Sequence, residues 1–173
     1  MAIVLEGFDN SGKSTLAEKF GLPVVHPGPR PKTWEEEIIC MDNQLADARL
    51  PIVMDRITCI SSRVYKQKNA QEYYDYLQRM VDTKCCVIIY CRPPTHTILD
   101  MSRHSTKTYD TKEHLKDLHR NANLYIGAYD KLFSSVPHLA YNYTKPDESV
   151  INQALDMQFN VGFWKSWRAG HAK

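Results

Sequence analysis

Residues 5–15, "LEGFDNSGKST", constrain the fold of this chain more than any other stretch. Between Gly7 and Ser14 the spacing is G-x-x-x-x-G-K-S, a pattern in which backbone N–H groups surround phosphates, the lysine reaches the outer phosphates and the hydroxyl binds Mg²⁺. An apolar run typical of a short buried strand, "AIVLE", precedes this segment, and a helix-like stretch, "STLAEKF", follows it. A strand, such a loop and a helix in succession predict a phosphate-binding loop, or P-loop.

The loop is expected to bind the phosphates of ATP together with Mg²⁺. Its glycines supply the backbone freedom that the tight turn requires, and the N-terminus of the following helix adds partial positive charge to the anion site. The alternative is a simple turn between a strand and a helix, which the specific spacing argues against. Ser14 is the expected metal ligand within the loop, and the residues expected to bind the nucleotide are Gly7, Asn10, Ser11, Gly12, Lys13, Ser14 and Thr15.

Apolar runs alternate with amphipathic stretches along the rest of the chain. Strands are expected over residues 2–6, 22–26, 50–56, 85–92 and 138–144, and helices over 14–20, 33–48, 69–82, 95–101, 111–133 and from about 147. Thr33 is the expected N-cap of the second helix, whose first turn carries Glu35 to Glu37. Strands that alternate with helices imply parallel βαβ units. The sequence therefore predicts an α/β fold with three layers and a central parallel sheet of about five strands.

Length and composition indicate one domain, 1–173, and a reducing environment. The 173 residues suffice for a sizeable core, and the net charge of +2 neither indicates nor excludes a nucleic-acid partner. We expect no membrane association, since no apolar run approaches a spanning length and the N-terminus lacks the regions of a signal peptide. The odd number of cysteines favours reduced thiols and a cytoplasmic location, the host cytoplasm if the protein is viral; they are Cys40, Cys59, Cys85, Cys86 and Cys91.

Charged residues follow the predicted strands at the edge where parallel α/β sheets bind their ligands. The pair Asp55 and Arg56 ends the third strand, and the segment from His26 to Arg30 follows the second. Phosphoryl transfer needs positive charge at the donor and acceptor phosphates and an acid that orients Mg²⁺. We therefore expect Asp55 to serve the metal and Arg56 to bind the acceptor, with His26 and Arg30 on the substrate side. The alternative is a surface ion pair at a strand end.

A polar stretch between two predicted helices, "RHSTKTYDTK", is rich in basic residues. We expect a lid-like segment at about 102–112 that closes over the triphosphate, excludes water and stabilises the transition state, with Arg103 as its catalytic residue. His104, Lys107 and Lys112 add to its positive charge. The alternative is an ordinary solvated loop.

The C-terminal stretch 159–173, "FNVGFWKSWRAGHAK", interleaves aromatic and basic residues. Aromatic platforms among basic groups suit stacking on unpaired bases, which makes DNA a candidate partner. The alternative, which we favour, is a last helix that docks its aromatic residues on the core and ends in a basic tail.

Three segments within residues 2–65 resemble thymidylate kinases. "LEGFDNSGKST" is similar to their F-E-G-x-D-x-x-G-K-S/T-T loop, "HPG" at 26–28 looks like their E-P-G turn, and "DRITCISSRVY" is similar to their D-R-Y segment with the S-S-x-A-Y that follows. His26 stands where that family has glutamate, and Ile57 where it has the tyrosine of D-R-Y. The resemblance implies a P-loop kinase fold with ATP and Mg²⁺. It also implies that Asp9 faces the sugar or reacting group of the acceptor, that Arg56 grips the acceptor, and that Ser61, Ser62 and Tyr65 line its base pocket.

Three functions are compatible with these features. The first is a deoxynucleoside monophosphate kinase, which moves the γ-phosphate of ATP to the α-phosphate of a nucleotide. The second is a kinase that phosphorylates the hydroxymethyl group of 5-hydroxymethyluracil in bacteriophage DNA; there Asp9 or Asp55 would accept the proton of the hydroxyl, and the base would have to be flipped out of a duplex. The third is a nucleotide-gated switch, although the guanine-reading N-K-x-D motif is absent. The first is favoured, and a homodimer is left open.

Overall fold

A computed structural model describes the chain except for residues 27, 29–30, 67–68, 83–85, 104–111 and 160–173. The strands are β1 (Ala2–Glu6), β2 (Val24–Val25), β3 (Val53–Asp55), β4 (Cys86–Cys91) and β5 (Leu139–Tyr141). The helices are α1 (Lys13–Glu18), α2 (Trp34–Asp47), α3 (Thr58–Lys66), α4 (Ala70–Asp82), α5 (Thr95–Arg103), α6 (Lys112–Phe133) and α7 (Ser149–Phe159).

The strands form one parallel sheet in the order β2-β3-β1-β4-β5. In the central strand, Val4 pairs with Met54 of β3 and with Ile88 of β4. Because all strands run the same way, their carboxyl ends meet at one edge of the sheet. The prediction of an α/β fold with a parallel sheet of about five strands is confirmed.

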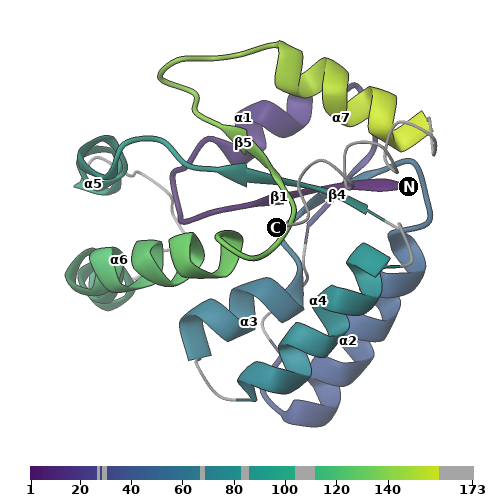
Figure 1. Cartoon of the computed structure of the whole chain (residues 1–173). Helices are drawn as coiled ribbons and strands as arrows, with labels where there is room; N and C mark the ends of the chain where they lie inside the picture. The colour runs from purple at the N-terminus through teal and green to yellow at the C-terminus, as the bar shows by residue number, and fades with distance from the viewer. Residues whose placement is uncertain (27, 29–30, 67–68, 83–85, 104–111, 160–173) are drawn as a thin grey trace.

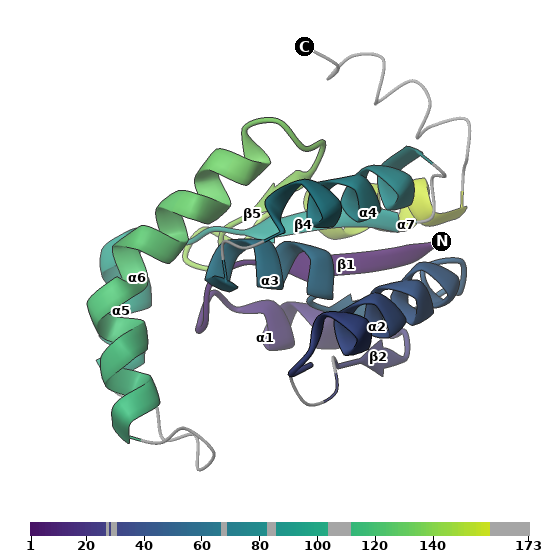
Figure 2. The same cartoon turned by 90° about the horizontal axis from the view of Figure 1, so that it is seen from below.

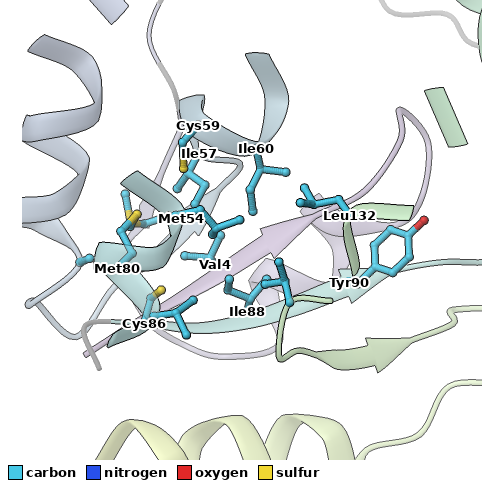
Figure 3. Close-up of a cluster of buried hydrophobic side chains, with 14 of the residues drawn as sticks. Val4, Met54, Ile57, Cys59, Ile60, Met80, Cys86, Ile88, Tyr90 and Leu132 are labelled. Atoms are coloured by element: carbon cyan, nitrogen blue, oxygen red, sulfur yellow. The ribbon is translucent and has the colours of Figure 1, made fainter. Parts of the chain in front are cut away.

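Helices cover both faces of the sheet, so the molecule has three layers (Figure 1). Alternate residues of β1 face opposite sides: Ile3 and Leu5 pack with α1 and α7, whereas Val4 packs with α2, α3, α4 and α6. Figure 3 shows the second of these cores, with Val4 and Ile88 of the sheet beneath Ile60 of α3. Burying one side chain of this size contributes about 1.5–3 kcal/mol, so the two cores hold the sheet edge that carries the site.

The helix α3 corrects the sequence prediction, which placed no helix between the third strand and residue 69. Its serines and β-branched residues are poor helix formers. However, Ile60 and Val64 lie one turn apart and are both buried against the sheet. Burial of this face outweighs the low propensity, and it converts the segment after Arg56 into a helix that begins at the site.

Other boundaries agree more closely with the sequence. Thr33 caps α2 as expected: its hydroxyl accepts the backbone N–H of Glu36 at 3.2 Å, and the Glu36 carboxylate accepts the N–H of Thr33 at 3.4 Å. The expected lid starts and ends in helices, because residues 102–103 belong to α5 and Lys112 begins α6. Figure 2 shows α5 and α6 side by side. His104, Lys107 and the C-terminal stretch after residue 159 lie outside the described residues.

Two further expectations can be compared with the described residues. The cysteines Cys40, Cys59, Cys86 and Cys91 carry free thiols, and all except Cys40 are buried; Cys85 lies outside the described residues. Within the part of the chain that the structure describes, no helix combines the length and the apolar character needed to cross a bilayer.

Candidate functional site

The P-loop follows β1 and winds closely around the N-terminus of α1. Gly7 has φ 142° and Gly12 has φ 86°, backbone angles that residues other than glycine rarely adopt. A Cβ atom on Gly7 would lie 2.4 Å from the carbonyl oxygen of Cys91, and one on Gly12 would lie 2.7 Å from the ring of Tyr143. Both glycines are therefore required by the backbone angle and by the close approach of β4 and of the segment after β5.

Lys13 lies at the centre of this loop. Its Nζ donates hydrogen bonds to the carbonyl oxygens of Gly7 at 3.0 Å and Phe8 at 2.9 Å, and to the Ser11 hydroxyl at 3.3 Å. Burial lowers the pKa of the Lys13 ammonium to about 8, because the charged form has lost its water. A phosphate bound in the loop would stabilise the charged ammonium group, so the geometry suits the binding of an anion at Lys13.

A cavity of about 550 Å³ opens over the P-loop. The strand ends supply its opposite walls, with Asp55 and Arg56 on one side and Tyr141 and Tyr143 on the other. Every residue predicted to bind the nucleotide, apart from Gly7 in the loop behind it, lines this cavity; they are Asn10, Ser11, Gly12, Lys13, Ser14 and Thr15. The predicted cluster therefore assembles around one space that can hold a polyphosphate.

Asp55 and Ser14 face this cavity with oxygen atoms suited to a hard cation. Oδ1 of Asp55 is buried and has no hydrogen-bond partner in the described part of the chain, and Oδ2 lies 3.3 Å from Nδ1 of His26. No group of three or more His, Cys, Asp or Glu side chains that could hold a metal occurs among the described residues. Mg²⁺ commonly takes only one or two protein ligands beside phosphate oxygens and water, so these residues fit it.

Arg56 adopts a left-handed backbone conformation, φ 75°, directly after β3. Its side chain forms an ion pair with Asp9 of the P-loop, and its Cζ lies 5.8 Å from the centre of the Tyr65 ring. Burial lowers the pKa of Arg56, but the Asp9 carboxylate overcomes this effect and raises the pKa above its usual value. The structure therefore brings the predicted catalytic residues Asp9 and Arg56 into contact, and keeps Arg56 charged.

A second, smaller cavity of about 100 Å³ lies behind Arg56, between α2 and α3. It contains the residues that the sequence assigns to the acceptor pocket, Ser61, Ser62 and Tyr65, and it adds Thr58 and Lys66. Arg56 lines both this cavity and the one over the P-loop. Arg56 therefore borders both spaces.

Three further predicted site residues line neither of these two cavities among the described residues. His26 is 63% exposed and contacts Asp55, but it lines a third cavity, of about 150 Å³, that Arg56 also lines, instead of the one that holds Ser61. Arg30 lies outside the described residues. Arg103 ends α5, and its side chain lies outside the described part as well.

Sequence reasoning missed two buried acids beside the site. Glu37 of α2 accepts hydrogen bonds from the Tyr73 hydroxyl and from Lys66, and it lies 3.5 Å from the Ser62 hydroxyl, so it ties the wall of the smaller cavity to α4. Glu6 ends β1 and is fully buried. Glu37 follows Glu35 and Glu36 in a run that indicates only a helix start, whereas Glu6 is a carboxylate at the end of an apolar strand, a signal that could have marked it.

No protein-family model matches the chain, and no curated protein sequence matches it. Among solved structures, the YorR protein of Bacillus subtilis in complex with phosphorylated GDP matches with a TM-score of 0.65 and 16% identity, over 96% of this chain and 98% of that one. Polyphosphate kinase 2 of Arthrobacter aurescens TC1 matches with a TM-score of 0.53 and 13% identity, over 95% of this chain and 68% of that one.

A deoxyadenosine kinase of M. mycoides, with dCMP and a flexible dCDP bound, is also similar, over 93% of this chain and all of that one. Its identity is 17%, and its TM-score of 0.47 is too low to support an inference. The other two likenesses extend over almost the whole of this chain and show a shared fold. The chain therefore has the three-layer α/β fold of the P-loop kinases.

Proposed function

We propose that this chain is an ATP- and Mg²⁺-dependent kinase that transfers the γ-phosphate to a deoxynucleoside monophosphate. The observation that carries this proposal is the position of Arg56, which lines both the cavity over the P-loop and the smaller cavity beside α3. Phosphoryl transfer needs a cation between the donor and acceptor phosphates. A permanently charged guanidinium group between two adjoining spaces meets that need.

The larger cavity is the donor side. The backbone N–H groups of the P-loop and the Lys13 ammonium would hold the outer phosphates of ATP. Ser14 and Asp55 would hold Mg²⁺, which neutralises charge on the β- and γ-phosphates when bound. The unpartnered oxygen of Asp55 supports this assignment.

The smaller cavity is the acceptor side. Hydroxyl groups of Ser61 and Ser62 line it, and the ring of Tyr65 offers an aromatic face for a nucleobase. A monophosphate attached to a nucleoside in this cavity would lie against Arg56, which can bind two phosphate oxygens at once. Asp9, paired with Arg56, would orient that guanidinium or contact the sugar.

The fold neighbours add support of a general kind. The YorR structure contains phosphorylated GDP, and polyphosphate kinase 2 is named for a phosphoryl transfer. Arg103 and Arg30 stay proposals for additional phosphate contacts. No observation among the described residues favours DNA as the acceptor, so polymer phosphorylation enters as an outcome of the test instead of a second proposal.

The test offers ATP labelled on its γ-phosphate together with each deoxynucleoside monophosphate, with ordinary DNA and with DNA containing 5-hydroxymethyluracil. Label in a deoxynucleoside diphosphate is expected, whereas label retained in intact polymer, or released only as inorganic phosphate, would contradict the proposal. Lys13→Ala should lose the activity. Lys131→Ala, which removes an exposed lysine from the last turn of α6, should keep it.

A further inference from the structure

Glu6 is a carboxylate whose burial the donor and acceptor chemistry does not explain. It is the last residue of β1 and is 0% exposed. Its Oε1 accepts the backbone N–H of Ile57 at 2.7 Å, and its Oε2 accepts the hydroxyl of Tyr129 at 3.3 Å. It lines neither of the two cavities that meet at Arg56. Burying a carboxylate costs free energy unless hydrogen-bond donors compensate for the lost water. The two donors that Glu6 has found therefore indicate its role.

The first contact holds the turn that carries Arg56. The strained left-handed backbone of Arg56 lies between two hydrogen bonds to the end of β1. Its own N–H donates to the carbonyl oxygen of Leu5 at 3.0 Å, and the next N–H, that of Ile57, donates to Glu6. Strained backbone persists only where its surroundings fix it. Glu6 supplies one of the two anchors that aim the Arg56 side chain between the cavities.

The second contact leads to the acceptor cavity. Tyr129 of α6 is fully buried, and its ring meets the Tyr65 ring edge to face with centres 6.1 Å apart. Tyr65 lines the smaller cavity and lies beneath the Arg56 guanidinium. By holding the hydroxyl of Tyr129, Glu6 fixes the ring against which Tyr65 packs.

We propose that Glu6 is a positioning residue for the acceptor side of the site, acting on Arg56 through the Ile57 N–H and on Tyr65 through Tyr129. This inference rests on the proposed kinase function. The P-loop contacts of Lys13 go to Gly7, Phe8 and Ser11 and do not involve the Glu6 carboxylate. Loss of Glu6 should therefore weaken acceptor binding selectively, whereas a merely structural role would affect donor and acceptor alike.

Two substitutions separate the hydrogen bond from the charge. Glu6→Leu removes both contacts at similar side-chain size, whereas Glu6→Gln keeps a carbonyl oxygen for the Ile57 N–H. Glu6→Leu should raise the acceptor KM about tenfold to a hundredfold, as expected for a lost hydrogen bond to a charged group. Its ATP KM should stay within about twofold of wild type. This range allows for the small electrostatic effect on Lys13 of removing the negative charge of Glu6. Glu6→Gln should recover most of the acceptor KM.

Equal losses for ATP and acceptor in Glu6→Leu, or equal acceptor losses in both variants, would overturn the proposal. If Glu6→Leu does not fold, Tyr129→Phe tests the second contact. It should raise the acceptor KM about threefold or more with the ATP KM unchanged, and an unchanged acceptor KM would overturn that part of the proposal.

A readout without catalysis separates this inference from the proposed function. Hydrogen exchange of the Ile57 amide, followed by NMR in the ligand-free protein, should be slow in wild type and in Glu6→Gln and fast in Glu6→Leu. The same exchange rate in wild type and Glu6→Leu would show that Glu6 does not anchor the turn, whatever the substrate. Slow exchange in wild type together with no labelled nucleotide would instead contradict the kinase proposal alone.

Discussion

Gly7→Ala tests whether the P-loop is held as closely against β4 as the structure requires. The new Cβ would lie 2.4 Å from the Cys91 carbonyl oxygen and 2.9 Å from the Ser11 hydroxyl, and the residue would keep a φ of 142°. Such a backbone conformation costs a non-glycine residue about 1–3 kcal/mol, and an overpacked contact against rigid backbone costs about 1–3 kcal/mol more. We expect a total of roughly 2–6 kcal/mol, because neither the strand nor the loop can move alone.

Thermal unfolding and ATP binding measure this effect. For a domain of this size, 1 kcal/mol shifts Tm by about 2–4 °C, so Gly7→Ala should lower Tm by about 4 °C or more. It should also weaken ATP binding, because Lys13 donates a hydrogen bond to the Gly7 carbonyl oxygen and would shift with it. The control is Gly127→Ala in α6, where no described atom outside the backbone of the helix and the adjoining residues lies within 4 Å of the added Cβ. Alanine there should stabilise the helix by up to about 1 kcal/mol. A Tm and an ATP affinity equal to wild type in Gly7→Ala would show that the P-loop is not held closely against β4.

Three further predictions concern the walls and the charges of the site. Gly12→Ala should weaken ATP binding, and Tyr143→Ala in the same chain should restore part of it by removing the ring 2.7 Å from the new Cβ. Calorimetry of ATP binding to the two single variants and the double variant checks this. Strictly additive changes in binding free energy would contradict it. Burial raises the pKa of Glu6 from 4.5 to about 7. Between these two pH values the folded state binds more protons than the unfolded state, so the protein loses stability as the pH rises from 4.5 to about 7. Urea unfolding of Glu6→Gln should show a shallower fall, with a gain over wild type of up to about 3 kcal/mol at pH 8, whereas parallel profiles would contradict this. Arg56→Met should raise the acceptor KM about tenfold or more in steady-state kinetics. The control Arg92→Met, which breaks the ion pair with Asp130 outside both cavities, should leave the acceptor KM near wild type. Equal effects of the two substitutions would argue against an acceptor contact of Arg56.

The sequence predicts the P-loop and its neighbouring elements well. The spacing from Gly7 to Ser14 determines the P-loop, because a loop of this composition between a strand and a helix has few alternatives. The helix start at Thr33 is also predictable, since its capping box is local in sequence. These features depend on residues close together in the chain.

The arrangement around Arg56 and the smaller cavity depends on contacts between distant segments. That Asp55 and Arg56 lie beside the P-loop follows from the pairing of β3 with β1, which spacing along the chain does not determine. The helix α3 forms because Ile60 and Val64 find a core, against the preference of its serines. Glu6 is visible in the sequence as an acid at the end of an apolar strand, but its partners Ile57 and Tyr129 are 51 and 123 residues away.

In the proposed function, a donor cavity and an acceptor cavity meet at Arg56, and one phosphate passes between them. A compound that joins adenosine and thymidine through five phosphates would occupy both cavities at once. Calorimetric titration of the wild-type chain should show that it binds about a hundredfold or more tightly than ATP, as expected when two binding events are linked. Arg56→Met should remove most of that advantage. An affinity equal to that of ATP in the wild-type chain, after each deoxynucleoside has been tried in place of thymidine, would contradict the claim.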